Sequence, residues 1–235
     1  MSILTKLSHY PTPTNYRIVA FHHIAGLPTS TQLSHCRIPS HYRITYLRRM
    51  KFLIVGLGNI GSEYDATRHN IGFDVADAFV IKNGGSFTLD RHAFKAEVKW
   101  KGKTFVVIKP TTYMNLSGKA MKYWLDKEKI AVENSMTIVD DLALPIETIR
   151  VRAGGSAAGH NGLRNIEQVL QTQQYPRLRF GIGNKFGKGQ QVDFVLGKWT
   201  PSELPYIKDK LLTSVEIIES FAAQGIERTM NIYNK

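Results

Sequence analysis

The chain has 235 residues, 31 of them lysine or arginine and 19 aspartate or glutamate, which gives a formal net charge of +12. No uninterrupted apolar run approaches the roughly 18 residues that a membrane-spanning helix needs, so a helical membrane protein is excluded and a soluble one is expected. Cys36 is the single cysteine, which excludes structural disulfides and cysteine-based zinc sites and favours a reducing, cytoplasmic setting.

The positive charge is unevenly distributed along the chain. Residues 1–49 contain six basic residues and no acidic one, which leaves a net charge of +6 for residues 50–235. This leading segment has neither helical nor strand periodicity, and we expect a disordered extension. Its composition is that of an organelle transit peptide, but it lacks an amphipathic face. Met50 directly precedes the first predicted strand, which favours an upstream-start artefact or a dispensable tail.

The stretch from Lys51 to Phe73 is expected to form a strand, a glycine-rich loop and a helix start, in that order. Its glycines satisfy the GxGxxG pattern of dinucleotide-binding folds, which by itself is a weak signal. That fold needs a helix at the last glycine and an acidic strand end about 20 residues on, and neither is present. A nucleotide-dependent oxidoreductase is therefore a distant alternative, and we expect no cofactor.

Strands and helices alternate along the rest of the body. Apolar spacing predicts helices at residues 72–81, through residues 120–125, through residues 166–170 after the glycine-rich segment 153–163, and a final one from near residue 201 to 221. Strands are predicted at residues 93–100 and 104–109, joined by a turn at 101–103, and at residues 136–139, 148–152 and 177–183. Asn115 or Ser117 is expected to cap the second of these helices. With no internal repeat, the pattern predicts one three-layer α/β domain at residues 50–235, with a mixed, mostly parallel twisted sheet and helices on both faces.

Polar residues gather where predicted strands end. Because functional groups of α/β sheets lie at the carboxyl ends of strands, Asn59, His69, Asn115 and Asp140 are expected to share one site with the pair His160 and Asn161. A histidine has an intrinsic pKa near neutrality, and a carboxylate on its second ring nitrogen would make it a better base. The alternative is that none of them is functional: His69 would be an ordinary core or surface histidine, and the others would be turn or cap residues.

Several motifs in the body carry a family resemblance. The string LIVGLGNIG, followed by EY and TRHNIGF, resembles the amino-terminal signature of bacterial-type peptidyl-tRNA hydrolases, with Ile60 where proline is more usual. The segments TYMNLSG, VDDLALP, GHNGL and DFVLGKW extend the resemblance across residues 50–235. It implies hydrolysis of the ester that joins a peptide to tRNA. A non-catalytic RNA-binding relative is the second hypothesis.

The resemblance also implies roles for single residues. His69 corresponds to the catalytic histidine and Asp140 to its acidic partner, while Asn59, Asn115 and Asn161 correspond to substrate-binding asparagines and Tyr64 and Met114 to residues that line the site. Ala143 replaces a second acid that is usual in the acidic turn. No HExxH motif or paired ligand spacing occurs in the body, so no metal ligand is expected.

The basic body favours a polyanionic partner. We expect a tRNA acceptor stem to be recognised through its shape and phosphates while its unpaired 3′ end reaches the site. Residues 153–163 are rich in glycine and are expected to form a mobile gate around Gly154–Gly159. A monomer is the default expectation. The candidate phosphate contacts are Lys119, Arg150, Arg152, Arg164, Arg177, Arg179, Lys185 and Lys188.

Overall fold

A seven-stranded sheet in the order β2-β3-β4-β1-β5-β7-β6 organises residues 50–235, the part of the chain that the computed structural model describes. The expectations for residues 1–49 lie outside these residues. The central strands run parallel, and the pairs β2–β3, β3–β4 and β6–β7 are antiparallel. The strands are β1 (Lys51–Gly56), β2 (Thr88–Asp90), β3 (Ala93–Trp100), β4 (Lys103–Pro110), β5 (Ser135–Asp141), β6 (Ile149–Arg152) and β7 (Arg177–Gly181).

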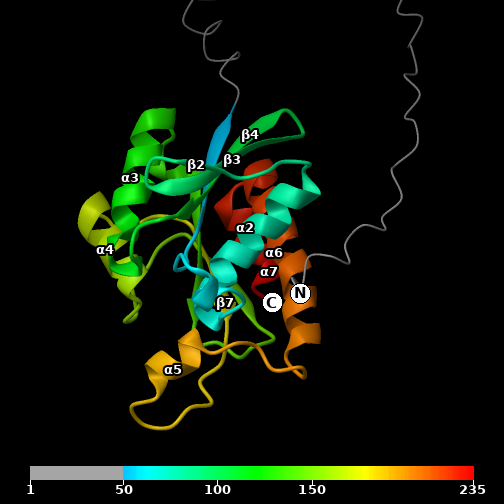
Figure 1. The fold of residues 1–235 in the computed structure, drawn as a ribbon. Helices are drawn as coiled ribbons and strands as arrows, with labels where there is room; N and C mark the ends of the chain where they lie inside the picture. The colour runs from blue at the N-terminus through cyan, green and yellow to red at the C-terminus, as the bar shows by residue number, and fades with distance from the viewer. Residues whose placement is uncertain (1–49) are drawn as a thin grey trace, which may run out of the picture. The chain divides into compact units, whose positions relative to one another are not determined.

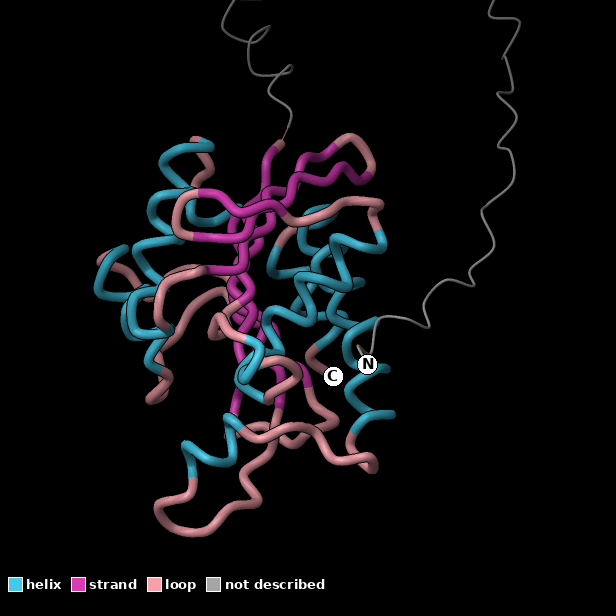
Figure 2. Tube along the Cα trace, in the orientation of Figure 1, coloured by secondary structure: helices cyan, strands magenta, loops and turns pink. Residues whose placement is uncertain are grey.

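Helices cover both faces of the sheet, so the predicted α/β fold class is confirmed (Figures 1 and 2). One face carries α2 (Ile71–Lys82), α6 (Leu204–Gln224) and α7 (Ile226–Tyr233), and the other carries α3 (Ser117–Glu128) and α4 (Asn161–Leu170). The short helix α5 (Gln191–Leu196) lies beyond the edge of the sheet together with the loop that precedes it (Figure 1). Among residues 50–235, no helix combines the length and apolar character needed to cross a membrane.

The central strand β1 explains why the fold has two apolar layers. Phe52 and Ile54 pack into the core beneath α2 and α6, whereas Leu53 and Val55 pack into the core beneath α3 and α4. Successive strand side chains point to opposite faces, so a strand covered on both sides must be apolar throughout. The continuous apolar run of β1 is therefore the signature of a buried central strand.

A close approach of two glycines brings α2 onto the end of β1. A Cβ atom on Gly56 would lie 2.3 Å from the carbonyl oxygen of Gly72, and one on Gly72 would lie 2.4 Å from that of Leu57. Only glycine allows backbone contacts this close. The first glycine of the GxGxxG pattern therefore serves helix packing, and the residues just before α2, including His69, are pressed against the carboxyl end of the sheet.

Several local expectations were wrong. Neither Asn115 nor Ser117 caps α3: the N-cap residue is Leu116, and the Ser117 hydroxyl donates to the carbonyl of Met114 at 2.8 Å. The helix expected from residue 201 begins at Leu204 and is not the last one, because Gly225 (φ 85°) separates it from α7. The short elements β2 and α5 were not predicted at all, since a few residues carry too little periodicity to be recognised.

Candidate active site

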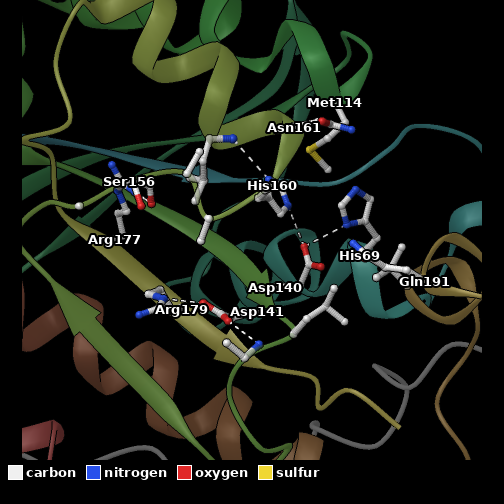
Figure 3. A pocket seen from close by; sticks show the side chains of 18 of the residues that line it. His69, Met114, Asp140, Asp141, Ser156, His160, Asn161, Arg177, Arg179 and Gln191 are labelled. Atoms are coloured by element: carbon white, nitrogen blue, oxygen red, sulfur yellow. Dashed lines mark hydrogen bonds and ion pairs between the residues drawn. The ribbon is translucent and has the colours of Figure 1, made fainter. Parts of the chain in front are cut away.

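Two histidines contact the same oxygen of Asp140 at the carboxyl end of β5. The Oδ1 atom of Asp140 lies 3.0 Å from Nδ1 of His69 and 3.1 Å from Nε2 of His160. His69 comes from the 3₁₀ turn Arg68–Asn70 that precedes α2, and His160 is the N-cap residue of α4. Figure 3 shows the carboxylate between the two rings. The expected pairing of His69 with Asp140 is present in the geometry, and His160 adds a partner that was not expected.

The hydrogen bonds of His160 determine where the protons lie. Its Nδ1 atom accepts from the backbone N–H groups of Gly162 and Leu163, at 3.1 and 3.3 Å. A nitrogen that accepts is unprotonated, so the proton of neutral His160 is on Nε2 and is donated to Asp140. The ionised carboxylate accepts from His69 as well, which places the proton of neutral His69 on Nδ1. The Nε2 atom of His69 is left with a free lone pair.

The pKa of Asp140 is lowered, and the pKa of His69 is raised. Burial by itself would raise the pKa of Asp140, but the electrostatic attraction and hydrogen bonds of the His160 and His69 N–H groups hold it well below its usual range. Burial likewise opposes the charged form of His69, yet the hydrogen bond and negative charge of Asp140 raise its pKa above the ordinary value. Asp140 therefore stays ionised, and His69 is a stronger base than a free imidazole.

The side chain of Asn70 fixes the backbone of Asn59. Its Oδ1 accepts from the Asn59 N–H at 2.8 Å, and its Nδ2 donates to the Asn59 carbonyl at 2.9 Å. Asn70 is only 4% exposed. One amide thus satisfies both backbone groups of a loop residue, in the way that a neighbouring strand would. This pair of bonds ties the glycine-rich loop to the residue that follows His69.

A cavity of about 600 Å³ contains most of the predicted site residues. Its lining includes Asn59, His69, Met114, Asp140 and Asn161, which come from segments far apart in the sequence. Figure 3 shows the last four of these side chains. Two predicted site residues are outside the lining. Asn115 is exposed on the turn beside Met114, and Tyr64 is half-buried in the loop before His69.

His69, Asp140 and His160 lie close enough together to be considered as metal ligands. Their three candidate ligand atoms lie within 4.8 Å of one another. To bind a metal through Nε2, His160 would have to carry its proton on Nδ1, where two backbone N–H groups already donate. Two donors and a third proton cannot share one nitrogen. The donor set therefore does not fit a metal.

Comparison with known proteins gives a consistent result. The family model described as peptidyl-tRNA hydrolase matches residues 53–235. The chain belongs to the peptidyl-tRNA hydrolase family. A peptidyl-tRNA hydrolase of Cytophaga hutchinsonii is 55% identical over 185 residues, which are 79% of this chain and 98% of the relative. One of Parabacteroides distasonis is also 55% identical and is covered to 99%.

Solved structures extend the comparison to the fold. The crystal structure of peptidyl-tRNA hydrolase from Acinetobacter baumannii is 32% identical to this chain and superposes with a TM-score of 0.74. The match covers 78% of this chain and 94% of that one. The resemblance found in the sequence motifs is thereby confirmed at the levels of family and fold.

Of the eight candidate phosphate contacts, Arg152, Arg177 and Arg179 line the cavity. Of these three arginines, only Arg152 is exposed. Arg179 is held by an ion pair with Asp141. Lys185 lines a second, adjoining cavity. Arg150 donates to the carbonyl of Lys235 at 3.1 Å. The remaining three, Lys119, Arg164 and Lys188, are exposed and do not line this cavity.

Arg177 lies in an environment that a phosphate contact would not have. The residue is only 2% exposed beneath α4. Its guanidinium donates to the Ser156 carbonyl at 2.9 Å and to Glu167 at 3.3 Å. Because Ser156 belongs to the glycine-rich segment, Arg177 fastens that segment to the sheet, and its side chain is not offered to solvent.

The sequence pattern assigns no role to three residues of the site. His160 contacts Asp140, Asn70 binds the backbone of Asn59, and Gln191 of α5 lines the cavity. The adjacency of His160 to Asn161 was the available signal. Nothing in the local pattern of Asn70 distinguishes a side chain that binds a distant backbone from one that caps a helix.

Proposed function

We propose that His69 is the general base of the family's reaction and that Asp140 orients it. As a family member, the chain is a hydrolase of the ester bond in peptidyl-tRNA, and peptidyl-tRNA is its substrate. The observation that carries the proposal is the 3.0 Å contact between His69 Nδ1 and Asp140, which leaves Nε2 free in a residue that lines the cavity. A histidine held in this way has the tautomer and the basicity that proton removal requires.

The reaction then proceeds by attack of water. His69 Nε2 removes a proton as the water oxygen bonds to the ester carbonyl carbon, and the carbonyl oxygen becomes an oxyanion. The bond to the ribose oxygen breaks next, and the proton on His69 passes to that oxygen. The products are a tRNA with a free terminal hydroxyl and a peptide carboxylic acid, which loses its proton to the solvent to become the carboxylate. General base catalysis supplies roughly 10² to 10⁴ in rate, and positioning supplies the rest.

The asparagines supply positioning. In this proposal Asn115 and Asn161 hold the water or the developing oxyanion, and Asn59 orients the peptide end of the substrate, with Tyr64 and Met114 beside it. An amide offers a donor and an acceptor without a charge that would need a partner. The location of Asn59, Met114 and Asn161 on the cavity wall supports these roles.

The tRNA is proposed to approach along the basic residues. The acceptor stem contacts the exposed cations through its phosphates, and the 3′ end enters the cavity past Arg152, which is both exposed and part of the lining. Such contacts need little base specificity. We also propose that the enzyme acts as a monomer in the cytoplasm.

The decisive experiment compares two substrates and one variant. The full chain should release the blocked amino acid from N-acetyl-aminoacyl-tRNA and spare free aminoacyl-tRNA, and His69→Ala should lose at least about 10²-fold in kcat. Tight binding of the RNA without cleavage by the wild-type chain would instead favour a binding module. Full activity of His69→Ala would keep the reaction and reject the base.

A further inference from the structure

A second cavity adjoins the one that holds His69. It has a volume of about 690 Å³ and shares two lining residues, Leu142 and Ala143, with the first cavity. Its walls come from the β5–β6 connection, the segment after β7, and the region from α5 to the start of α6. The two cavities are therefore neighbours across one short stretch of chain, Leu142 and Ala143.

The walls of the second cavity are partly apolar. Leu142, Ile146 and Phe194 are only partly buried, and they pack at the edge of the core on the α2 and α6 side of the sheet. The rim carries neutral polar groups, including Asn184 and Tyr206, the latter 47% exposed. Partly exposed apolar walls with a few polar groups are typical of a site that binds a flexible chain by shape and backbone contacts.

The charges of the two cavities differ. At the first cavity Arg177 and Arg179 are paired with Glu167 and Asp141, so the exposed Arg152 is the arginine that it offers to a phosphate. The second cavity has Glu147, Glu203 and a single cation, Lys185, and Glu203 is paired with Arg68 at 2.8 Å. Phosphates are favoured where cations exceed anions, so the second cavity does not favour them. It is better suited to the peptide part of the substrate than to the polyanionic tRNA.

We propose that the second cavity binds the peptide residues that precede the esterified residue of peptidyl-tRNA. This inference rests on the proposed function. The first cavity must hold the terminal nucleoside and the esterified residue. Together these groups are about as large as the ligands that fill cavities of this size. Each further peptide residue extends the chain by up to about 3.5 Å. The peptide therefore passes Leu142 and Ala143, and its next residues contact Ile146 and Phe194.

The test compares long and short peptides on the same tRNA. Wild-type full chain should have a kcat/KM about tenfold higher for a pentapeptidyl-tRNA with apolar residues than for N-acetyl-aminoacyl-tRNA, the gain expected from burying one apolar side chain. Asn184→Trp and Ser202→Trp place a bulky ring in the second cavity at exposed positions outside the first cavity. Both variants should bring the ratio close to one and leave the N-acetyl substrate unaffected.

Leu212→Trp is the matched control, because Leu212 is 50% exposed on α6 and lines neither cavity. It should keep the wild-type ratio. A ratio near one in the wild type, an unchanged ratio in both filling variants, or a parallel loss on both substrates would overturn the inference. Failure of the wild type to cleave N-acetyl-aminoacyl-tRNA would instead overturn the proposed function, on which the inference depends.

A cross-linking experiment locates the peptide directly. A photoreactive residue is placed three positions before the ester in peptidyl-tRNA bound to the His69→Ala variant, which keeps the substrate intact. Cross-links to the segments 144–147 or 182–185, identified by mass spectrometry, are expected. Cross-links confined to residues that line only the first cavity would contradict the assignment.

Discussion

His69 and His160 share one acceptor, the Oδ1 atom of Asp140, and their ring centroids are 5.1 Å apart. The backbone N–H groups at the start of α4 fix the tautomer of His160, so both rings donate to the carboxylate. The start of α4 is thus connected to His69 through three successive hydrogen bonds: to His160, from His160 to Asp140, and from His69 to Asp140. This arrangement makes the pH dependence and the helix cap testable together.

The pH profile should report the raised pKa of His69. Protonated His69 cannot remove a proton, so kcat/KM is expected to be low in acid and to rise through an apparent pKa above 6.5, the ordinary histidine value. Asp140→Asn removes the negative charge that raises this pKa. The acid limb should then move to lower pH, and the plateau should fall by about 10²-fold or more. An acid limb at the same pH in wild type and variant would show that another group titrates.

Two substitutions at His160 separate its two contacts. Asparagine can still accept the helix N–H groups but is too short to donate to Asp140, whereas alanine loses both contacts. We expect similar losses of kcat, roughly tenfold, for His160→Asn and His160→Ala. Chemical denaturation should show His160→Ala to be less stable than His160→Asn by about 1 kcal/mol. Wild-type kcat in His160→Asn would mean that the bond to Asp140 is not used.

Asn70→Ala should impair activity by releasing the backbone of Asn59. Two hydrogen bonds to buried or partly buried groups are lost, and a decrease of about tenfold in kcat/KM is expected. Asn83→Ala is the control: the Asn83 side chain also donates to a backbone carbonyl, that of Phe79, at 2.8 Å, but it is at the far end of α2. Equal losses of activity in the two variants would argue against a specific role for Asn70.

Asp74 should make stability depend on pH. Burial, followed by the charge of Asp77, raises the pKa of Asp74 to about 7 from 3.8. The folded state therefore favours the protonated form: stability is intact below pH 3.8 and is lost as the pH rises from there to about 7. Asp74→Asn should raise the free energy of unfolding at pH 8 by about 1 to 2 kcal/mol, allowing for partial solvent screening. Equal gains at pH 4 and pH 8 would contradict the assignment.

Arg152 and Arg177 should respond differently to loss of charge. Arg152 is exposed at the cavity, so Arg152→Gln should weaken RNA binding and reduce the slope of log K against log salt by about 1. Arg177 is 2% exposed and paired with Glu167. Arg177→Gln should instead lower the free energy of unfolding by about 3 kcal/mol. A salt slope unchanged by Arg152→Gln would remove Arg152 from the RNA path.

Much of the fold could be predicted because local sequence patterns carry it. The apolar run of β1, the helical spacing of α2 and the Lys101–Gly102 turn of the β3–β4 hairpin are properties of short segments, and all three are present. The motifs around Asn59, His69 and Asp140 likewise identified the family and brought these residues into one site. Short elements such as β2 and α5 were not predicted, because their formation depends on neighbouring elements more than on their own sequence.

The sequence by itself therefore determined the fold class, the family and the pairing of His69 with Asp140, because each can be recognised from consecutive residues or from motifs. Only the tertiary structure decided how His160, Asn70 and Arg177 are used. The proton position on His160 depends on a helix start, the Asn70 amide meets a loop backbone, and Arg177 is covered by α4. These outcomes depend on which atoms lie within about 3 Å of a side chain, and that follows from packing between distant segments.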